Sequence, residues 1–452
     1  MDACLLSRIQ FAVTIGFHFL FPPITIGLAW LLVIVEYMAW RRNDAVAERV
    51  GRLFASILGL TFAVGVASGI VMEFQFGTNW ARYSKFVGDI FGAPLAAEGV
   101  FAFFLESTFL GVYLFARGRL SKRAHWISIL MVAVGATLSA FWIIVANSWM
   151  QTPAGYTVNA AAGRAELTDF AAAVFNPSTM IRYFHTVMAC LASGAFFMAG
   201  AAAYVLLGAA RTAPLSAAAF GPTPVQAMAR RALAVALSFG LVASILVVAP
   251  SGHQHIKQVA VTQPEKFAAF EGLYTSQERA PLVLFALPFE DPPHLKARIE
   301  IPGMLSWLAF GDTGARVQGI DAFPRGDVPP LRLTFISFHS MVALGGLLIA
   351  VSVVGVWMVR RGTLWTSRRM LWGLMICAPL PLAACQLGWM AAEVGRQPWI
   401  VYRLMRTADA YSSNVPAAHV LASLILFSAI YAALGALYLF LLRHRLNKEV
   451  VA

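Results

Sequence analysis

The sequence predicts an all-α integral membrane protein with about nine transmembrane helices. Of its 452 residues, 59% are hydrophobic and 12% are charged, whereas soluble domains carry about 25% charged residues. A helix of about 20 apolar residues is long enough to cross a hydrocarbon core of about 30 Å. Nine segments reach that length, at 10–38, 53–74, 94–116, 124–147, 181–208, 230–250, 333–358, 370–393 and 416–442.

The basic residues predict the orientation of these helices. Short loops rich in arginine and lysine follow the first, third, fifth, seventh and ninth segments, and they alternate with longer, less basic loops. This is the positive-inside pattern, so the N-terminus is expected outside and the C-terminus in the cytoplasm. A nucleic-acid surface would gather its charge on one patch instead. The net charge of +12 therefore predicts no nucleic-acid partner.

Three regions follow from this arrangement. Residues 1–250 hold the first six helices, residues 251–330 form an external loop, and residues 331–452 hold the last three helices. A loop of this length is more often functional than a simple connection. The four cysteines show no CxxC spacing, so disulfides, zinc and iron–sulfur clusters are not expected.

Ionisable side chains interrupt several of the apolar segments. A charge near the bilayer centre costs about 2.5–3.5 kcal/mol on insertion scales, so such residues usually face a cavity, a cofactor or an ion path. The interrupting residues are Glu98, Glu106, His18, His185, His339 and Glu393. We therefore expect chemistry within the membrane, carried out by a redox haem protein or by a proton- or ion-coupled transporter.

The depths of these residues favour haem. At a rise of about 1.5 Å per residue, the candidate ligands gather in the outer half of the membrane. Imidazole, thioether and carboxylate groups on separate helices are suitable axial ligands for haem iron. His339 and Met341 are two residues apart and point about 200° apart, so both cannot ligate one iron. The spacing leaves a His185–His339 pair and a His185–Met341 pair open.

Five motifs resemble subunit I of cytochrome bd-type quinol oxidases, in the same order and over nearly the whole chain. They are LSRIQFAVTIGFHFLFPPITIG (6–27), MEFQFGTNW (72–80), VGDIFGAPLAAEGVFAFFLEST (87–108), IIVANSWMQTP (143–153) and AEVGRQPW (392–399). The resemblance implies a multi-pass subunit of a bacterial cytoplasmic (inner) membrane oxidase. Such an enzyme oxidises ubiquinol or menaquinol at the outer face and reduces dioxygen to water with cytoplasmic protons, without pumping. A haem-containing subunit of a quinone-linked dehydrogenase, or a transporter, is the alternative.

The same resemblance implies the haem ligands. His185 and Met341 match the axial ligands of a low-spin haem b. His18 and Glu393 match the ligands of two high-spin haems, one a haem b and the other a haem d or a further haem b. Glu98 and Glu106 match carboxylates near the oxygen-reducing haem and on its proton route.

Further residues match other parts of the family pattern. Trp389 matches an aromatic residue between haems, and Arg396 matches a basic residue beside the haem pair. Lys266 and Glu271 match the quinol-oxidising part of the external loop. This loop is short, which resembles the branch that includes cyanide-insensitive oxidases, and His339 stands where better-known members have arginine. The family also implies a second membrane subunit and, in some members, a very small third chain.

Overall fold

The computed structural model describes residues 2–211, 221–290 and 293–451, most of which are helical. Within them, nine helical spans are long and apolar enough to cross a membrane, as predicted. In chain order these spans are α1 with α2 (Ala3–His18, Phe21–Arg41), α3 (Ala45–Thr78), α4 with η1 and α5 (Ala81–Ala97, Glu98–Phe103, Phe104–Phe115), α6 (Lys122–Gln151), α7 with α8 (Phe170–Val174, Thr179–Ala209), α9 with η2 and α10 (Pro224–Leu246, Val247–Gly252, His253–Thr262), α13 (Leu331–Arg361), α14 with α15 (Arg368–Cys377, Leu380–Val394) and α17 (Ala417–Val451).

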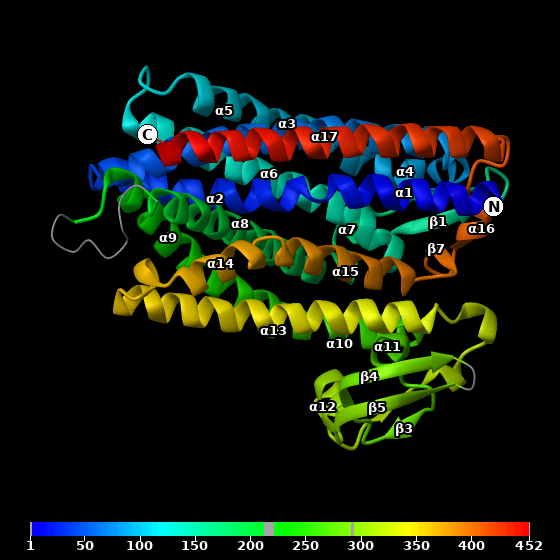
Figure 1. Ribbon diagram of the computed structural model, residues 1–452. Helices are drawn as coiled ribbons and strands as arrows, with labels where there is room; N and C mark the ends of the chain where they lie inside the picture. Colours follow the sequence, from blue (N-terminus) through cyan, green and yellow to red (C-terminus); the bar gives the residue numbers. More distant parts are fainter. Residues whose placement is uncertain (1, 212–220, 291–292, 452) are drawn as a thin grey trace.

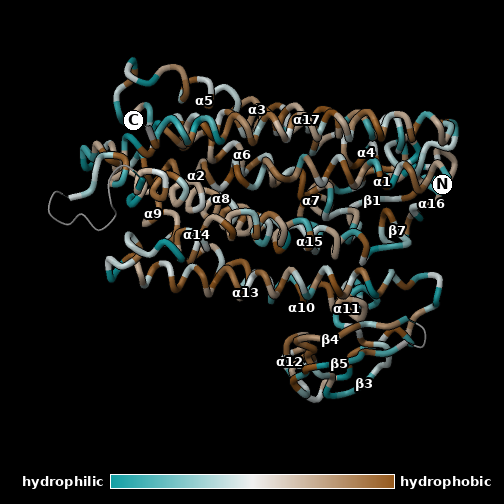
Figure 2. Tube along the Cα trace, viewed as in Figure 1, coloured by the Kyte–Doolittle hydropathy of each residue, from teal (hydrophilic) through white to brown (hydrophobic). Residues whose placement is uncertain are grey.

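The spans form one bundle, with the two ends of the chain at opposite ends of it (Figure 1). Apolar residues run along the spans, and hydrophilic residues gather mostly at the two ends (Figure 2). The arrangement agrees with an odd number of crossings, while the side on which each end lies stays a prediction from the charges. At the centre of the bundle α2 meets α8 closely, because a Cβ added to Gly27 would lie 2.5 Å from the Cys190 carbonyl oxygen. Small residues commonly allow helices to approach in this way within membranes.

Several spans are broken, although the sequence predicts continuous helices. The first span is interrupted between His18 and Phe21. The third span contains the π-helical segment η1, which begins at Glu98, and the sixth contains η2, which includes Pro250. Proline removes a backbone donor and disturbs the regular helical hydrogen bonds. Short π-helical turns of this kind occur frequently at functional sites.

The outer loop is shorter and more structured than expected. The sixth span continues as helix to Thr262, beyond its predicted end at residue 250. The loop then contains α11 (Pro264–Glu271), β3 (Gln277–Glu278), β4 (Leu282–Glu290), β5 (Pro293–Ile301), α12 (Met304–Phe310) and β6 (Arg316–Val317), with two 3₁₀ turns (Ile320–Ala322, Arg325–Asp327). β4 and β5 form an antiparallel hairpin.

Other non-helical elements are short and lie in connecting segments. They are β1 with β2 (Tyr156–Asn159, Arg164–Leu167) and β7 with β8 (Trp399–Val401, Met405–Arg406), each pair antiparallel. A 3₁₀ turn (Leu364–Thr366) precedes α14, and the short α16 (Thr407–Ala410) precedes α17. The membrane part is therefore wholly helical, as predicted.

Helix α11 positions the two residues that the sequence predicts at a quinol site. Pro264 occupies its first turn, where the missing N–H costs nothing, and Gly272 ends it with a φ of 63°. Phe267 and Phe270 anchor the helix in a buried apolar cluster. Lys266 and Glu271 are thereby held on a rigid two-turn helix, and both are buried.

Candidate functional site: a buried cavity with cationic walls

A large cavity lies among the spans and beneath the outer loop. Its volume is about 1280 Å³, above the range of about 300–1,000 Å³ that is usual for one small-molecule site. Seven of the predicted site residues line it: His185, Lys266, Glu271, Met341, Trp389, Glu393 and Arg396. The remaining three, His18, Glu98 and Glu106, are not among its lining residues.

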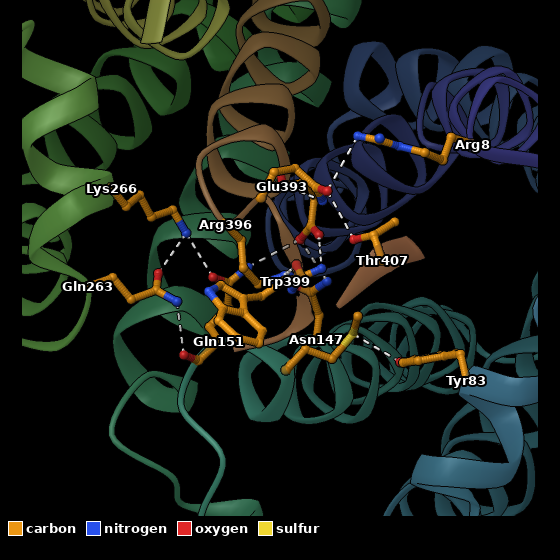
Figure 3. Close-up of polar contacts among 12 residues, drawn as sticks. Arg8, Tyr83, Asn147, Gln151, Gln263, Lys266, Glu393, Arg396, Trp399 and Thr407 are labelled. Atoms are coloured by element: carbon orange, nitrogen blue, oxygen red, sulfur yellow. Dashed lines mark hydrogen bonds and ion pairs between the residues drawn. The ribbon is translucent and has the colours of Figure 1, made fainter. Parts of the chain in front are cut away.

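Glu393 lies in a dense polar network at the end of α15 (Figure 3). Its Oε2 forms an ion pair with Arg396, one helical turn further along the chain. Its Oε1 accepts hydrogen bonds from Asn147 Nδ2 at 3.1 Å and Gln151 Nε2 at 3.3 Å, both from α6. Arg182 of α8 in turn donates to the Asn147 carbonyl oxygen at 3.1 Å. The carboxylate is thus oriented by three separate segments of the chain.

Lys266 joins this network from the outer loop. Its Nζ donates to Gln151 Oε1 at 2.7 Å and to Gln263 Oε1 at 2.8 Å (Figure 3). Its aliphatic stem lies against Gly395, where an added Cβ would come within 3.0 Å of Lys266 Cγ. Burial, and then the positive charges of Arg182 and Arg396, lower the pKa of Lys266 well below its usual value.

Three buried basic side chains line this end of the cavity. Arg182, Lys266 and Arg396 are 8%, 3% and 4% exposed. Glu393 interacts with all three, and Glu265, which is 4% exposed, interacts with Lys266 as well. Arg396 Nη1 is buried without a hydrogen-bond partner among the described residues. Buried charges normally require a partner. The cluster is therefore suited to hold anionic groups of a molecule bound in the cavity.

Glu271 lies on the same helix as Lys266 but in apolar surroundings. It is 3% exposed, and its Oε2 has no hydrogen-bond partner in the described structure. Burial raises the pKa of Glu271 to about 8. This carboxyl can therefore exchange a proton near neutral pH with a ligand in the cavity.

His185 and Met341 approach the cavity from α8 and α13. The His185 Nδ1 lies 3.2 Å from Ser251 Oγ, and Ser251 donates its own proton to the Leu246 carbonyl oxygen. Nδ1 is therefore the protonated nitrogen, which leaves Nε2 with a lone pair for a metal. Met341 packs against Gly388, where an added Cβ would lie 2.6 Å from the sulfur.

His339 is held differently from His185. Its Nδ1 lies 3.1 Å from the Phe335 carbonyl oxygen, and its Nε2 lies 2.9 Å from the carbonyl oxygen of Val283 in β4. Both nitrogens thus face backbone acceptors. This geometry favours Met341 over His339 as a partner of His185, while the pairing itself stays a prediction.

His18 occupies the break between α1 and α2. Its Nδ1 lies 3.1 Å from the Gly65 carbonyl oxygen and from Ser68 Oγ, both of α3. Gly69 leaves room for the ring, because an added Cβ there would lie 3.0 Å from His18 Cε1. These contacts of Nδ1 orient the imidazole, as Ser251 orients His185, and leave Nε2 free to act as a ligand.

Glu98 and Glu106 face α6 along one stripe. Glu98 Oε1 accepts a hydrogen bond from Ser139 Oγ at 2.6 Å. Glu106 is 6% exposed and packs on Gly135, one turn away from Ser139 on the same face of α6. The two carboxylates are separated by about 12 Å along their span. Glu73, which lines the cavity, interacts electrostatically with Glu98 and so links this stripe to the cavity.

Comparisons with known proteins decide the family of this chain. Residues 6–450 match the family model described as cytochrome bd terminal oxidase subunit I. This chain belongs to that family. It is 38% identical to cytochrome bd ubiquinol oxidase subunit 1 of Bacillus subtilis (strain 168), over 99% of this chain and 94% of the relative. It is also 34% identical to cytochrome bd-II ubiquinol oxidase subunit 1 of Escherichia coli (strain K12), over 91% of this chain and 90% of the relative.

The bd oxidase fold is confirmed by a solved structure. The bd oxidase from Geobacillus thermodenitrificans is similar with a TM-score of 0.90 and 30% identity, covering 99% of each chain. Family membership and the nine apolar spans together make this bd oxidase subunit a multi-pass protein of the bacterial cytoplasmic membrane.

The cavity fits the haem that a cytochrome requires. Its walls offer imidazole, thioether and carboxylate groups from separate spans, which are established kinds of ligand or electrostatic partner for haem iron. The unpartnered Arg396 Nη1 fits the carboxylate groups that haem carries.

Several residues of the bd oxidase site were not predicted from sequence. Asn147, Gln151 and Arg182 orient Glu393, and Ser251 orients His185. A partial signal was present, because Asn147 and Gln151 are four residues apart and therefore share one face of a helix. Polar residues one turn apart in an apolar helix indicate a polar partner on another helix.

Proposed function

We propose that this chain is the subunit of a terminal oxidase that oxidises ubiquinol or menaquinol and supports the reduction of dioxygen to water. The observation that carries the proposal is the large cavity, which brings Lys266 and Glu271 of the outer loop together with His185, Met341 and Glu393 of the bundle. The names of the relatives, which are ubiquinol oxidase subunits, support the same reaction.

Four residues would hold the haems. His185 and Met341 would bind a low-spin haem b, and His18 and Glu393 would bind two high-spin haems, namely a haem b and a haem d or a further haem b. Bound haem would supply the redox chemistry that joins quinol oxidation to the reduction of dioxygen. Ser251 and Gly65 support this assignment by orienting the two imidazoles. Arg396 would neutralise negative charge beside the haem pair, and Trp389 would fill the space between haems.

Quinol oxidation would use the two charged groups of α11. Glu271 in its ionised form would accept a proton from a quinol hydroxyl, because its raised pKa allows it to bind that proton near neutral pH. Lys266 would hold the ring by donating a hydrogen bond, since its Nζ is already aimed by Gln151 and Gln263. The protons would leave on the outer side.

Protons for water formation would come from the cytoplasm. Glu106 lies nearer the cytoplasmic end of its span than Glu98, according to the predicted orientation, and both face the same stripe of α6. A proton would pass from Glu106 to Glu98 and then toward the cavity. Opposite sides for proton release and uptake would separate charge across the membrane without pumping.

The chain would work with a second membrane subunit, because its relatives are named as subunit 1 of their oxidases. Some members of the family carry a very small third chain, and we propose that it is an optional partner here. Lipid surrounds the assembly.

A spectrum and an oxygen trace together test this function. Dithionite-reduced membranes that contain the assembled complex should show haem bands, and a long-wavelength chlorin band would identify haem d. The same membranes should consume oxygen when quinol is added. A colourless complex would indicate a transporter, and a haem spectrum without quinol-driven oxygen uptake would indicate a dehydrogenase subunit.

A further inference from the structure

The hairpin β4–β5 and helix α12 expose large apolar side chains, although both lie in the outer loop. Five such side chains are 44–60% exposed: Phe285, Leu287, Ile299, Trp307 and Phe310. Contiguous apolar surface on a protein marks a site of interaction with another molecule or with a membrane. These elements lie beside the N-terminal part of α13 rather than beyond its end (Figure 1).

Two contacts set the depth of the hairpin against α13. At the tip, the backbone N–H of Arg332 donates to Glu290 Oε1 at 3.1 Å. At the root, His339 Nε2 lies 2.9 Å from the Val283 carbonyl oxygen. Arg332 and His339 are separated by about 10 Å along α13. The root of the hairpin therefore lies deeper along the bundle than its tip, beside the apolar run of α13.

The two faces of the hairpin differ in character. On the inner face, Val283, Ala286 and Leu295 pack against Phe335 of α13. The cross-strand pairs of the outer face, from root to tip, are Phe285 with Ile299, Leu287 with Lys296, and Phe289 with His294. The outer face is thus apolar at the deep end and gains a cation and an imidazole toward the tip. Lys296 Nζ reaches over the Phe289 ring at 4.7 Å.

The change from apolar side chains at the root of the hairpin to a cation and an imidazole at its tip matches the change from hydrocarbon to water at the outer boundary of a membrane. The neighbouring part of α13 exposes Leu333 and Ile336 to its surroundings by 43–44%, and lipid covers such a face of a transmembrane span. The apolar outer face of the hairpin continues that surface at the same depth. A two-stranded sheet has free edges, which cannot enter the hydrocarbon core. Aromatic and cationic side chains are, however, typical of the interfacial zone.

We propose that the root of the hairpin and α12 form a lipid-facing wedge, made by Phe285, Ile299, Trp307 and Phe310, that lies in the interfacial zone of the outer leaflet. Its partner is phospholipid. The contact of His339 with Val283 holds the wedge at this depth.

The wedge also separates lipid from the cavity. Leu282 of β4 and Leu305 of α12 line the cavity from the other side of the same elements. Quinol dissolved in the membrane would then reach Glu271 by passing along the wedge, without leaving the interfacial zone. This consequence rests on the proposed quinol oxidation, whereas the contact with lipid does not.

Photo-crosslinking tests the contact with lipid in the assembled oxidase. A diazirine-bearing amino acid is placed at position 285 or 299, the complex is illuminated in phosphatidylcholine nanodiscs, and adducts are identified by mass spectrometry. Val158 is the matched control, because it is 51% exposed in β1, in a different connecting segment. Phospholipid adducts at 285 and 299 but not at 158 are expected. Adducts to another protein chain, or the same low yield of lipid adducts at all three positions, would overturn the proposal.

Quinol kinetics test the consequence separately. Ile299→Lys, with Ile299→Asn as a milder variant, should raise the KM for a long-tailed quinol several-fold. The KM for a short-tailed, water-soluble quinol and the reduced haem spectrum should stay unchanged. Equal increases for both quinols would refute access along the wedge and leave the crosslinking result to decide the contact with lipid. If Ile299→Lys loses the haem spectrum, the complex has not assembled and the KM values are measured with Ile299→Asn instead. Unchanged KM values in Ile299→Asn would also refute access along the wedge.

Discussion

The pH dependence of quinol oxidation should report the ionisation of Glu271. Burial raises the pKa of this carboxyl to about 8, and only the ionised form can accept a proton from quinol. The ionised fraction is then about one tenth at pH 7 and about one hundredth at pH 6. The value of kcat/KM for quinol should therefore rise about tenfold per pH unit below pH 8 and level off above it.

Replacing Glu271 by glutamine removes the proton acceptor but keeps the size of the side chain. A positioned general base contributes about 10²–10⁴-fold, which corresponds to about 3–5 kcal/mol at 1.36 kcal/mol per tenfold. Glu271→Gln should lower kcat/KM at pH 8 by about 100-fold or more and flatten the rise between pH 6 and pH 8. The measurement is oxygen uptake driven by quinol from pH 6 to pH 9.

Glu278 provides the matched control. It is an exposed carboxylate in the same loop, so Glu278→Gln should retain both the rate and the pH profile. The reduced haem spectrum of each variant verifies that the complex has assembled. If Glu271→Gln retains the rise toward pH 8, another group accepts the proton and the assignment of Glu271 is wrong.

Three further predictions concern the haem ligands, the carboxyl group of Glu106 and helix α11. Met341→Leu should abolish the low-spin haem signal or convert it to high spin, whereas His339→Ala should retain it; the opposite pattern in reduced spectra would make His339 the ligand. Glu106→Gln should slow oxygen uptake about tenfold or more with haem content unchanged, and a rate equal to that of the unmodified enzyme would remove Glu106 from the proton route. Gly395→Ala should raise the quinol KM several-fold, because the new Cβ would lie 2.5 Å from the Ala391 carbonyl oxygen and 3.0 Å from Lys266 Cγ, so that the backbone and the lysine must shift. An unchanged KM would show that the lysine adjusts freely.

The sequence allowed candidate site residues to be proposed but not their surroundings. His18, His185 and Glu393 stand out because an ionisable group in an apolar segment needs a reason. The orienting partner Ser251 is an ordinary polar residue that carries no such signal, and Asn147 carries only the partial signal of its spacing from Gln151. The partners can be recognised only once the helices are packed, because the contact of His185 with Ser251 joins residues 66 positions apart.

His339 and the outer loop illustrate the same limit. Spacing alone left His339 and Met341 as equal candidates for one iron. The carbonyl oxygen of Val283, which belongs to a strand 56 residues away, occupies one ring nitrogen of His339 and weakens its candidacy. The loop was also expected to begin at residue 251, but Pro250 is absorbed into a π-helical turn and the helix continues to Thr262.

The sequence by itself determined the number of membrane spans and the kinds of chemical groups within them, because lipid demands long apolar helices and makes each buried charge costly. The motifs also determined the family, because they occur in order along the chain. Only the tertiary structure decided which of these groups share one cavity, where buried basic side chains gather, and how the outer hairpin lies against α13. Those properties depend on how helices rotate and pack against distant segments, which no local pattern of residues specifies.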